Sequence, residues 1–175
     1  MRNICAAVLV LFLLNPPLQA GETAWQEVAP GVSVRLISAG TVDASGKALL
    51  ALEIDMPEDT KTYWRVPGET GLPTELDFSA STGVADHDQH WPLPLRDETD
   101  GYMDYVYFGH TVLPIELDVT NPSGTVDVQA TLGVCSDICV PAQARLVLPV
   151  TEGSPDTANA LRISQALADV PIAWQ

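Results

Sequence analysis

Two cysteines, Cys135 and Cys139, are the residues of this chain whose type and spacing point to chemistry. A thiolate attacks disulfides and binds soft metals, so a close cysteine pair suits either thiol–disulfide exchange or metal binding. Along a continuous strand, rising about 3.3 Å per residue, their Cα atoms would lie roughly 13 Å apart, whereas a disulfide needs about 4.4–6.8 Å. The pair is therefore either unbridged or carried on a bent loop, and Ser136, Asp137 and Pro141 favour the loop.

A bridge across so short a loop would stabilise the fold only weakly. The chain-entropy account of disulfides assigns it about 2 kcal/mol, and a stapling disulfide would more usefully join distant segments. Three interpretations stay open at this point: reversible thiol–disulfide exchange, copper handling by the same thiols, and an interaction domain with a purely structural disulfide. The reduction potential separates the first from the third, because structural disulfides usually lie below about −300 mV.

Histidines form the other candidate cluster. His87 and His90 are three residues apart, and Met56, Met103 or the cysteines could complete a soft-metal site with them. The segment reads as a loop, with no helix to place both rings on one face, so a solvated polar loop is the favoured interpretation. His110 lies at an expected turn, and nothing in its sequence context points to a functional role. We predict no metal site and no cofactor.

The segments on either side of the cysteine pair read as β-strands, because they alternate loosely and are rich in β-branched residues. Similar runs recur along the chain, whereas the proline- and glycine-rich stretch 67–94 is expected to be irregular or to lie at a sheet edge. The expected strands are 31–39, 48–54, 62–66, 102–108, 111–119, 125–134 and 144–150. Short strands with frequent turn signals predict an all-β fold, an immunoglobulin-like antiparallel β-sandwich rather than a barrel.

A short helix is expected near the C-terminus. Ser154 is the expected N-cap, and Pro155 suits the first helical position. The negative charge of Asp156 complements the helix dipole, and Pro171 ends the helix. The predicted apolar face consists of Ala158, Leu161, Leu167 and Val170. We expect an appendage or tail over residues 153–175 that has no chemistry of its own.

The N-terminal residues 1–20 have the features of a secretory signal peptide. Arg2 precedes an apolar run at 4–14, which is too short to span a bilayer, and the segment ends Leu18-Gln19-Ala20. Cleavage near Ala20 would leave 155 of the 175 residues and would remove Cys5 with the signal. The chain is thus predicted to be periplasmic and without stable membrane insertion, with one β-domain over residues 21–152, in a compartment that permits disulfides.

The chain is strongly acidic. Its formal net charge is −15, and loss of Arg2 with the signal makes it −16. Such a balance argues against nucleic acid and anionic membrane surfaces as partners, and it is compatible with a basic partner or simply with solubility.

Three stretches together resemble a known family. They are YWRVPGETGLPTELD at 63–77, WPLPLRDETDGY at 91–102 and CSDICVP at 135–141. In this order they are similar to the N-terminal periplasmic domain of the DsbD and ScsB thiol–disulfide interchange proteins, the second of which is associated with copper tolerance. The resemblance covers residues 32–150 and implies an immunoglobulin-like domain.

The resemblance also implies roles for the cysteine pair. The pair would exchange electrons with thioredoxin-like periplasmic proteins or a membrane electron carrier, so the chain is a possible protein-disulfide reductase or interchange component. Cys139, the second cysteine, would make the intermolecular bond and Cys135 would resolve it. Cys135 also ends an apolar strand, which favours its being the more buried of the two. No Lys, Arg or His is near in sequence to lower the pKa of either thiol.

A cap loop is the remaining feature that the resemblance implies. Asp97, Glu98, Asp100 and Tyr102 fall where an aromatic loop shields the pair in the DsbD domain. Tyr102 is the candidate ring, and an ordinary aromatic at the start of a strand is the alternative. Two departures stand out: the cysteine spacing is shorter than in DsbD and closer to ScsB, and the chain ends before any transmembrane or thioredoxin-like domain. Separate proteins are therefore expected to supply and accept its electrons.

Overall fold

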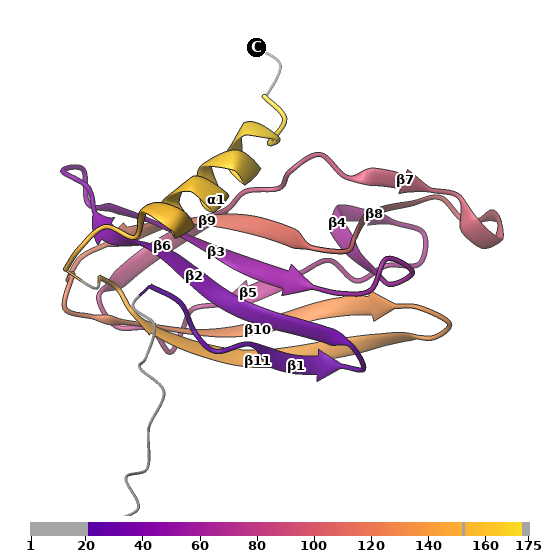
Figure 1. The fold of residues 1–175 in the computed structure, drawn as a ribbon, viewed down its shortest axis with the longest axis horizontal. Helices are drawn as coiled ribbons and strands as arrows, with labels where there is room; N and C mark the ends of the chain where they lie inside the picture. The colour runs from indigo at the N-terminus through magenta and orange to yellow at the C-terminus, as the bar shows by residue number, and fades with distance from the viewer. Residues whose placement is uncertain (1–20, 152, 173–175) are drawn as a thin grey trace, which may run out of the picture.

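The computed structural model describes residues 21–151 and 153–172, and two antiparallel β-sheets face each other across the core (Figure 1). The signal peptide predicted at 1–20 lies outside the described residues. The first sheet has the order β1 (Gln26–Ala29), β2 (Val32–Val42), β3 (Lys47–Asp55), β9 (Thr111–Val119) and β6 (Val84–Gln89). The second has the order β11 (Cys139–Pro149), β10 (Thr125–Cys135), β4 (Lys61–Gly68), β8 (Asp104–Phe108) and β7 (Leu95–Asp97), with β5 (Glu75–Asp77) paired to β10.

Alternating burial explains why these segments form a sandwich. In β11, each second residue from Ala142 to Leu148 is buried and those between are exposed, so the strand has one apolar face and one face exposed to solvent. The apolar faces of both sheets meet in a single cluster that includes Leu36, Leu52 and Leu132. The predicted antiparallel sandwich with a short C-terminal helix is confirmed, and each predicted strand corresponds to an observed one.

The stretch 67–94 contains more regular structure than its prolines and glycines indicated. Strand β6 pairs with β9 at the edge of the first sheet, in agreement with the edge position that was expected. The loop interpretation is wrong for His87, which belongs to β6 and whose ring lies 4.5 Å from that of Phe78, measured between centroids. His87 is nevertheless exposed, and His90 lies beyond the end of the strand. Backbone pairing with β9 outweighs the polar composition of this strand.

Helix α1 (Thr157–Ala168) packs on the outer face of the first sheet, over β2, β3 and β9 (Figure 1). Its N-cap is Asp156, whose carboxylate accepts from the backbone N–H of Asn159, and not Ser154 as predicted. The predicted apolar face is also partly wrong: Leu161 is 59% exposed, whereas Ile163 is fully buried against the sheet. The two residues are about 200° apart around the helix, so they cannot share a face. Within the described part of the chain, no helix is long and apolar enough to cross a membrane.

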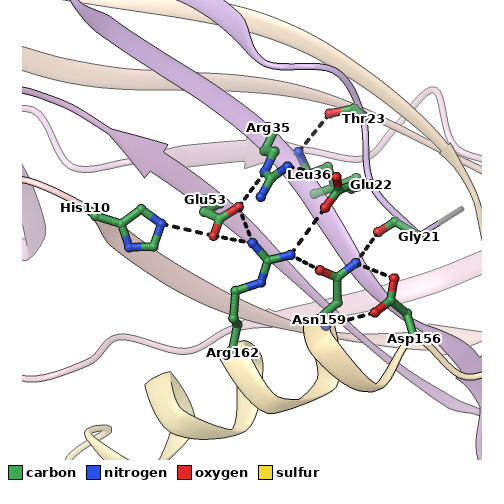
Figure 2. A network of polar contacts seen from close by, with 10 residues as sticks. All are labelled: Gly21, Glu22, Thr23, Arg35, Leu36, Glu53, His110, Asp156, Asn159 and Arg162. Carbon is green, nitrogen blue, oxygen red and sulfur yellow. Dashed lines mark hydrogen bonds and ion pairs between the residues drawn. The ribbon is translucent and has the colours of Figure 1, made fainter. Parts of the chain in front are cut away.

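A buried carboxylate attaches this helix to the sheet. Glu53 on β3 is 1% exposed and accepts hydrogen bonds from Arg35, at 2.5 Å, and from Arg162 of α1, at 3.1 Å (Figure 2). His110 lies 3.0 Å from the same carboxylate, and Glu22 bridges both arginines. Burial raises the pKa of the Glu53 carboxyl, but the arginines outweigh it and hold the pKa below its usual value.

Candidate redox site

The hairpin of β10 and β11 carries the cysteine pair at one end of the sandwich. Cys135 and Cys139 are the last residues paired across the two strands, and a turn over residues 136–138 joins them. Their Cα atoms are 4.1 Å apart, and a disulfide links them, so the bent loop predicted from sequence is confirmed. Cys135 is 1% exposed, as predicted, whereas Cys139 is exposed. The bond therefore joins one exposed and one buried cysteine.

A tyrosine hydroxyl from β4 contacts the sulfur pair. The Tyr63 hydroxyl lies 2.8 Å from Sγ of Cys135 and 3.7 Å from Sγ of Cys139. The ring is 1% exposed and packs with Cys135 and Val106 in a small cluster, to which Phe108 adds its side chain. This hydroxyl can donate a hydrogen bond to the Cys135 sulfur when that sulfur becomes a thiolate.

Two glycines leave the space that the Tyr63 ring occupies. A Cβ on Gly71 would lie 2.1 Å from the ring atom Cδ1, and a Cβ on Gly133 would lie 3.1 Å from Cδ2. Any side chain at Gly71 would displace the ring, since such an approach is far inside van der Waals contact. The two glycines thus leave room for the ring in the position that places its hydroxyl at the disulfide.

The segment that carries Gly71 is pinned by a buried carboxylate, Asp104, whose side chain is 3% exposed. Asp104 accepts hydrogen bonds from the backbone N–H groups of Glu69 and Thr70, at 3.1 and 3.2 Å, and from the Thr70 hydroxyl at 2.6 Å. Burial raises the pKa of the Asp104 carboxyl, but the hydrogen bonds from Thr70 and Lys61 outweigh it and lower the pKa overall. Asp104 therefore stays ionised and keeps the segment over Tyr63.

A lysine lies beside the pair, although none is near in sequence. Lys61 is the backbone partner of Cys135 across β4 and β10, and its Nζ lies 2.7 Å from Asp97 and 3.3 Å from Asp104. Burial lowers the pKa of Lys61, but hydrogen bonds to the two carboxylates outweigh it and raise the pKa. Because two carboxylates offset this one cation, the Tyr63 hydroxyl is the better candidate for stabilising a thiolate at Cys135.

The family comes from comparison of the sequence. The profile described as thiol:disulfide interchange protein DsbD, N-terminal, matches residues 33–151. The chain belongs to this family. No curated protein matches the chain. A crystal structure of the N-terminal periplasmic domain of ScsB from Proteus mirabilis superposes with a TM-score of 0.76 and 27% sequence identity, over 89% of this chain and 62% of that one.

Membership of the DsbD N-terminal family agrees with the resemblance inferred from the three sequence stretches. The chain thus combines the DsbD N-terminal domain with a close-spaced disulfide between Cys135 and Cys139. Across residues 21–151 and 153–172, no three His, Cys, Asp or Glu side chains are grouped so as to hold a metal ion.

The cap loop that the DsbD family suggested connects β7 to β8 and lies at the same end of the molecule as the β10–β11 turn (Figure 1). Asp97 opens the loop and forms the ion pair with Lys61, Glu98 pairs with Arg96 at the surface, and Asp100 belongs to a short 3-10 helix. The Tyr102 ring is 52% exposed. Sequence reasoning missed Tyr63, whose hydroxyl is the one that reaches the sulfurs, although it stands inside the YWRVPG run.

Proposed function

We propose that the domain passes reducing equivalents, through Cys135 and Cys139, between a thioredoxin-like protein or membrane electron carrier and a periplasmic client. The observation that carries this proposal is one disulfide between an exposed cysteine, Cys139, and a buried cysteine, Cys135, beside the Tyr63 hydroxyl. The ScsB domain that superposes on the chain is a periplasmic one, which supports the same compartment here. A signal peptide over 1–20 would deliver the chain there.

The electrons balance in two displacements. A donor thiolate attacks Sγ of Cys139, the disulfide breaks, and its electron pair moves to Sγ of Cys135, which receives a hydrogen bond from Tyr63. The donor's second thiolate then attacks the donor's own sulfur in the mixed disulfide and releases Cys139. The donor leaves as a disulfide, and the domain leaves with two reduced cysteines that take up protons from water.

Delivery to the client reverses these steps. The Cys139 thiolate attacks the client disulfide, and Cys135 then attacks Sγ of Cys139 in the mixed disulfide. The client leaves as a dithiol, and the bridge between Cys135 and Cys139 forms again. Cys139 is thus the sulfur that bonds to partners, and Cys135 resolves the intermediate.

Reversible oxidation of the pair is the first expected result. Alkylation with mass analysis, before and after mild reductant, should show both cysteines changing state together, with a reduction potential above about −300 mV. The Cys135→Ser, Cys139→Ser double variant should stay folded, because the bridge closes so short a loop. A pair that resists mild reductant, or a double variant that unfolds, would favour a structural disulfide instead.

We further propose that the loop at 97–102 caps the pair, with Tyr102 as its ring. The Lys61–Asp97 ion pair supports this, because it fastens the start of the loop beside Cys135. Both Tyr102→Ala and Asp97→Asn should speed reduction of the disulfide by dithiothreitol by about fivefold, the factor that corresponds to roughly 1 kcal/mol. Stopped-flow fluorescence or quenched alkylation measures the rate, and circular dichroism checks the fold. Unchanged rates in both variants would leave Tyr102 as an ordinary aromatic at the start of a strand.

A further inference from the structure

The direction of the disulfide bond limits where a partner can approach. Cys135 belongs to β10 and Cys139 to β11, and the two are paired directly across the hairpin. A thiolate displaces a sulfur along the line of the bond that breaks, from the side opposite the leaving sulfur. Attack on Cys139 with Cys135 as the leaving group therefore comes from the side of β11 that faces away from β10.

That side of β11 is a sheet edge. Strand β11 ends the order of the second sheet, with β10 as its neighbour, and the described residues include no second strand paired to it. The backbone groups along its outer edge are thus available to a partner. A protein that brings a thiolate to Cys139 along the bond direction must lie against this edge.

Apolar side chains flank the exposed Cys139 there. Ile138 is 74% exposed and Val140 is 42% exposed, immediately before and after Cys139. A turn tip in water usually carries polar residues, so an exposed isoleucine beside a redox sulfur calls for a contact that buries it. A redox partner has to contact both neighbours when it reaches the sulfur.

We propose that Ile138, Val140 and the free edge of β11 form the docking face for a thioredoxin-like protein whose reactive thiol lies in an apolar surface. This inference rests on the proposed exchange function. The docking face holds the partner thiolate in line with the disulfide, and it selects proteins over small thiols, which need no such contact. Because the partner lies against β11, we also expect the neighbouring apolar residue Leu72 to contribute less to partner binding. Leu72 lies on the β10 side of the pair, where its carbonyl accepts from the Gly133 N–H at 3.1 Å.

The test compares a protein reductant with a small one. Thioredoxin and dithiothreitol, both reduced, are each reacted with the oxidised wild-type domain and with Ile138→Ser, Val140→Ser, Leu72→Ser and Val147→Ser. Val147 is a matched control, because it is 50% exposed on the same strand but far from the cysteines. The rate constant with thioredoxin should fall about tenfold for the first two variants, as when a contact loses a branched aliphatic side chain. It should change less than twofold for the last two.

With dithiothreitol, all five proteins should react alike. Equal rates with thioredoxin across the set would overturn the docking proposal, and so would a loss confined to Leu72→Ser, or a wild type that dithiothreitol reduces and thioredoxin does not. These outcomes leave the exchange function standing. Failure of both reductants with the wild type would instead contradict the exchange function itself, so the two proposals fail in distinguishable ways.

Discussion

Cys135→Ser is expected to accumulate a mixed disulfide with a thioredoxin-like protein in the exported compartment, and Cys139→Ser is not. In the first variant the exposed Cys139 still attacks a partner disulfide, but the resolving thiol is gone and the intermediate persists. In the second variant the remaining Cys135 is 1% exposed and cannot reach a partner. Non-reducing electrophoresis detects the trapped species as a band of higher mass that reductant removes.

Each outcome of this trapping experiment has a distinct meaning. Partners trapped in the opposite order would reverse the roles of the two cysteines while leaving the exchange function intact. If neither variant traps a protein in its own compartment, the exchange function is contradicted, and copper binding by the thiols becomes the better hypothesis. Metal titration of the reduced protein then tests it. The wild-type protein serves as the control, since its intermediate resolves.

Glu53→Gln is expected to lower the free energy of unfolding by about 3 kcal/mol at neutral pH. The carboxylate is 1% exposed, and its loss leaves Arg35 and Arg162 without their shared partner under helix α1. The matched control is Glu116→Gln, a half-buried carboxylate paired with Lys47, whose loss should cost less than about 1 kcal/mol. Urea unfolding followed by circular dichroism measures both variants. A Glu53→Gln variant no less stable than the control would show that the network contributes little.

The pH dependence of stability in the wild type and in Glu53→Gln gives a second measurement of the same network. The pKa of Glu53 is lowered in the folded protein from its usual value of 4.5, so the unfolded chain takes up the proton first as acid is added. The ionised Glu53 carboxylate therefore stabilises the fold fully at pH values above its usual pKa, and this stabilisation is lost as the pH falls through the pKa of the folded protein. The gap in stability between wild type and Glu53→Gln should shrink below about pH 4.5, the ordinary value for this carboxyl. A constant gap down to pH 3 would contradict this account.

The sequence by itself determined the local features of this protein. Alternation and β-branched residues located the strands of the sandwich, since burying one face of a strand leaves a period of two in the chain. The short cysteine spacing together with turn-forming residues predicted a bent loop, because an extended segment cannot bring two such cysteines within bonding distance. The apolar strand before Cys135 also indicated that this cysteine is the more buried of the two.

Tertiary structure alone decided what surrounds the disulfide and where helix α1 is attached. Tyr63 is 72 residues from Cys135, and Lys61 and Asp104 meet only because β4, β8 and β10 belong to one sheet. Strand order and register are set by packing between distant segments, which no local period records. The same holds for helix α1. Its sequence pattern predicted a capped helix, but the position of the helix on β2 and β3 decides that Ile163 is buried and Leu161 is exposed.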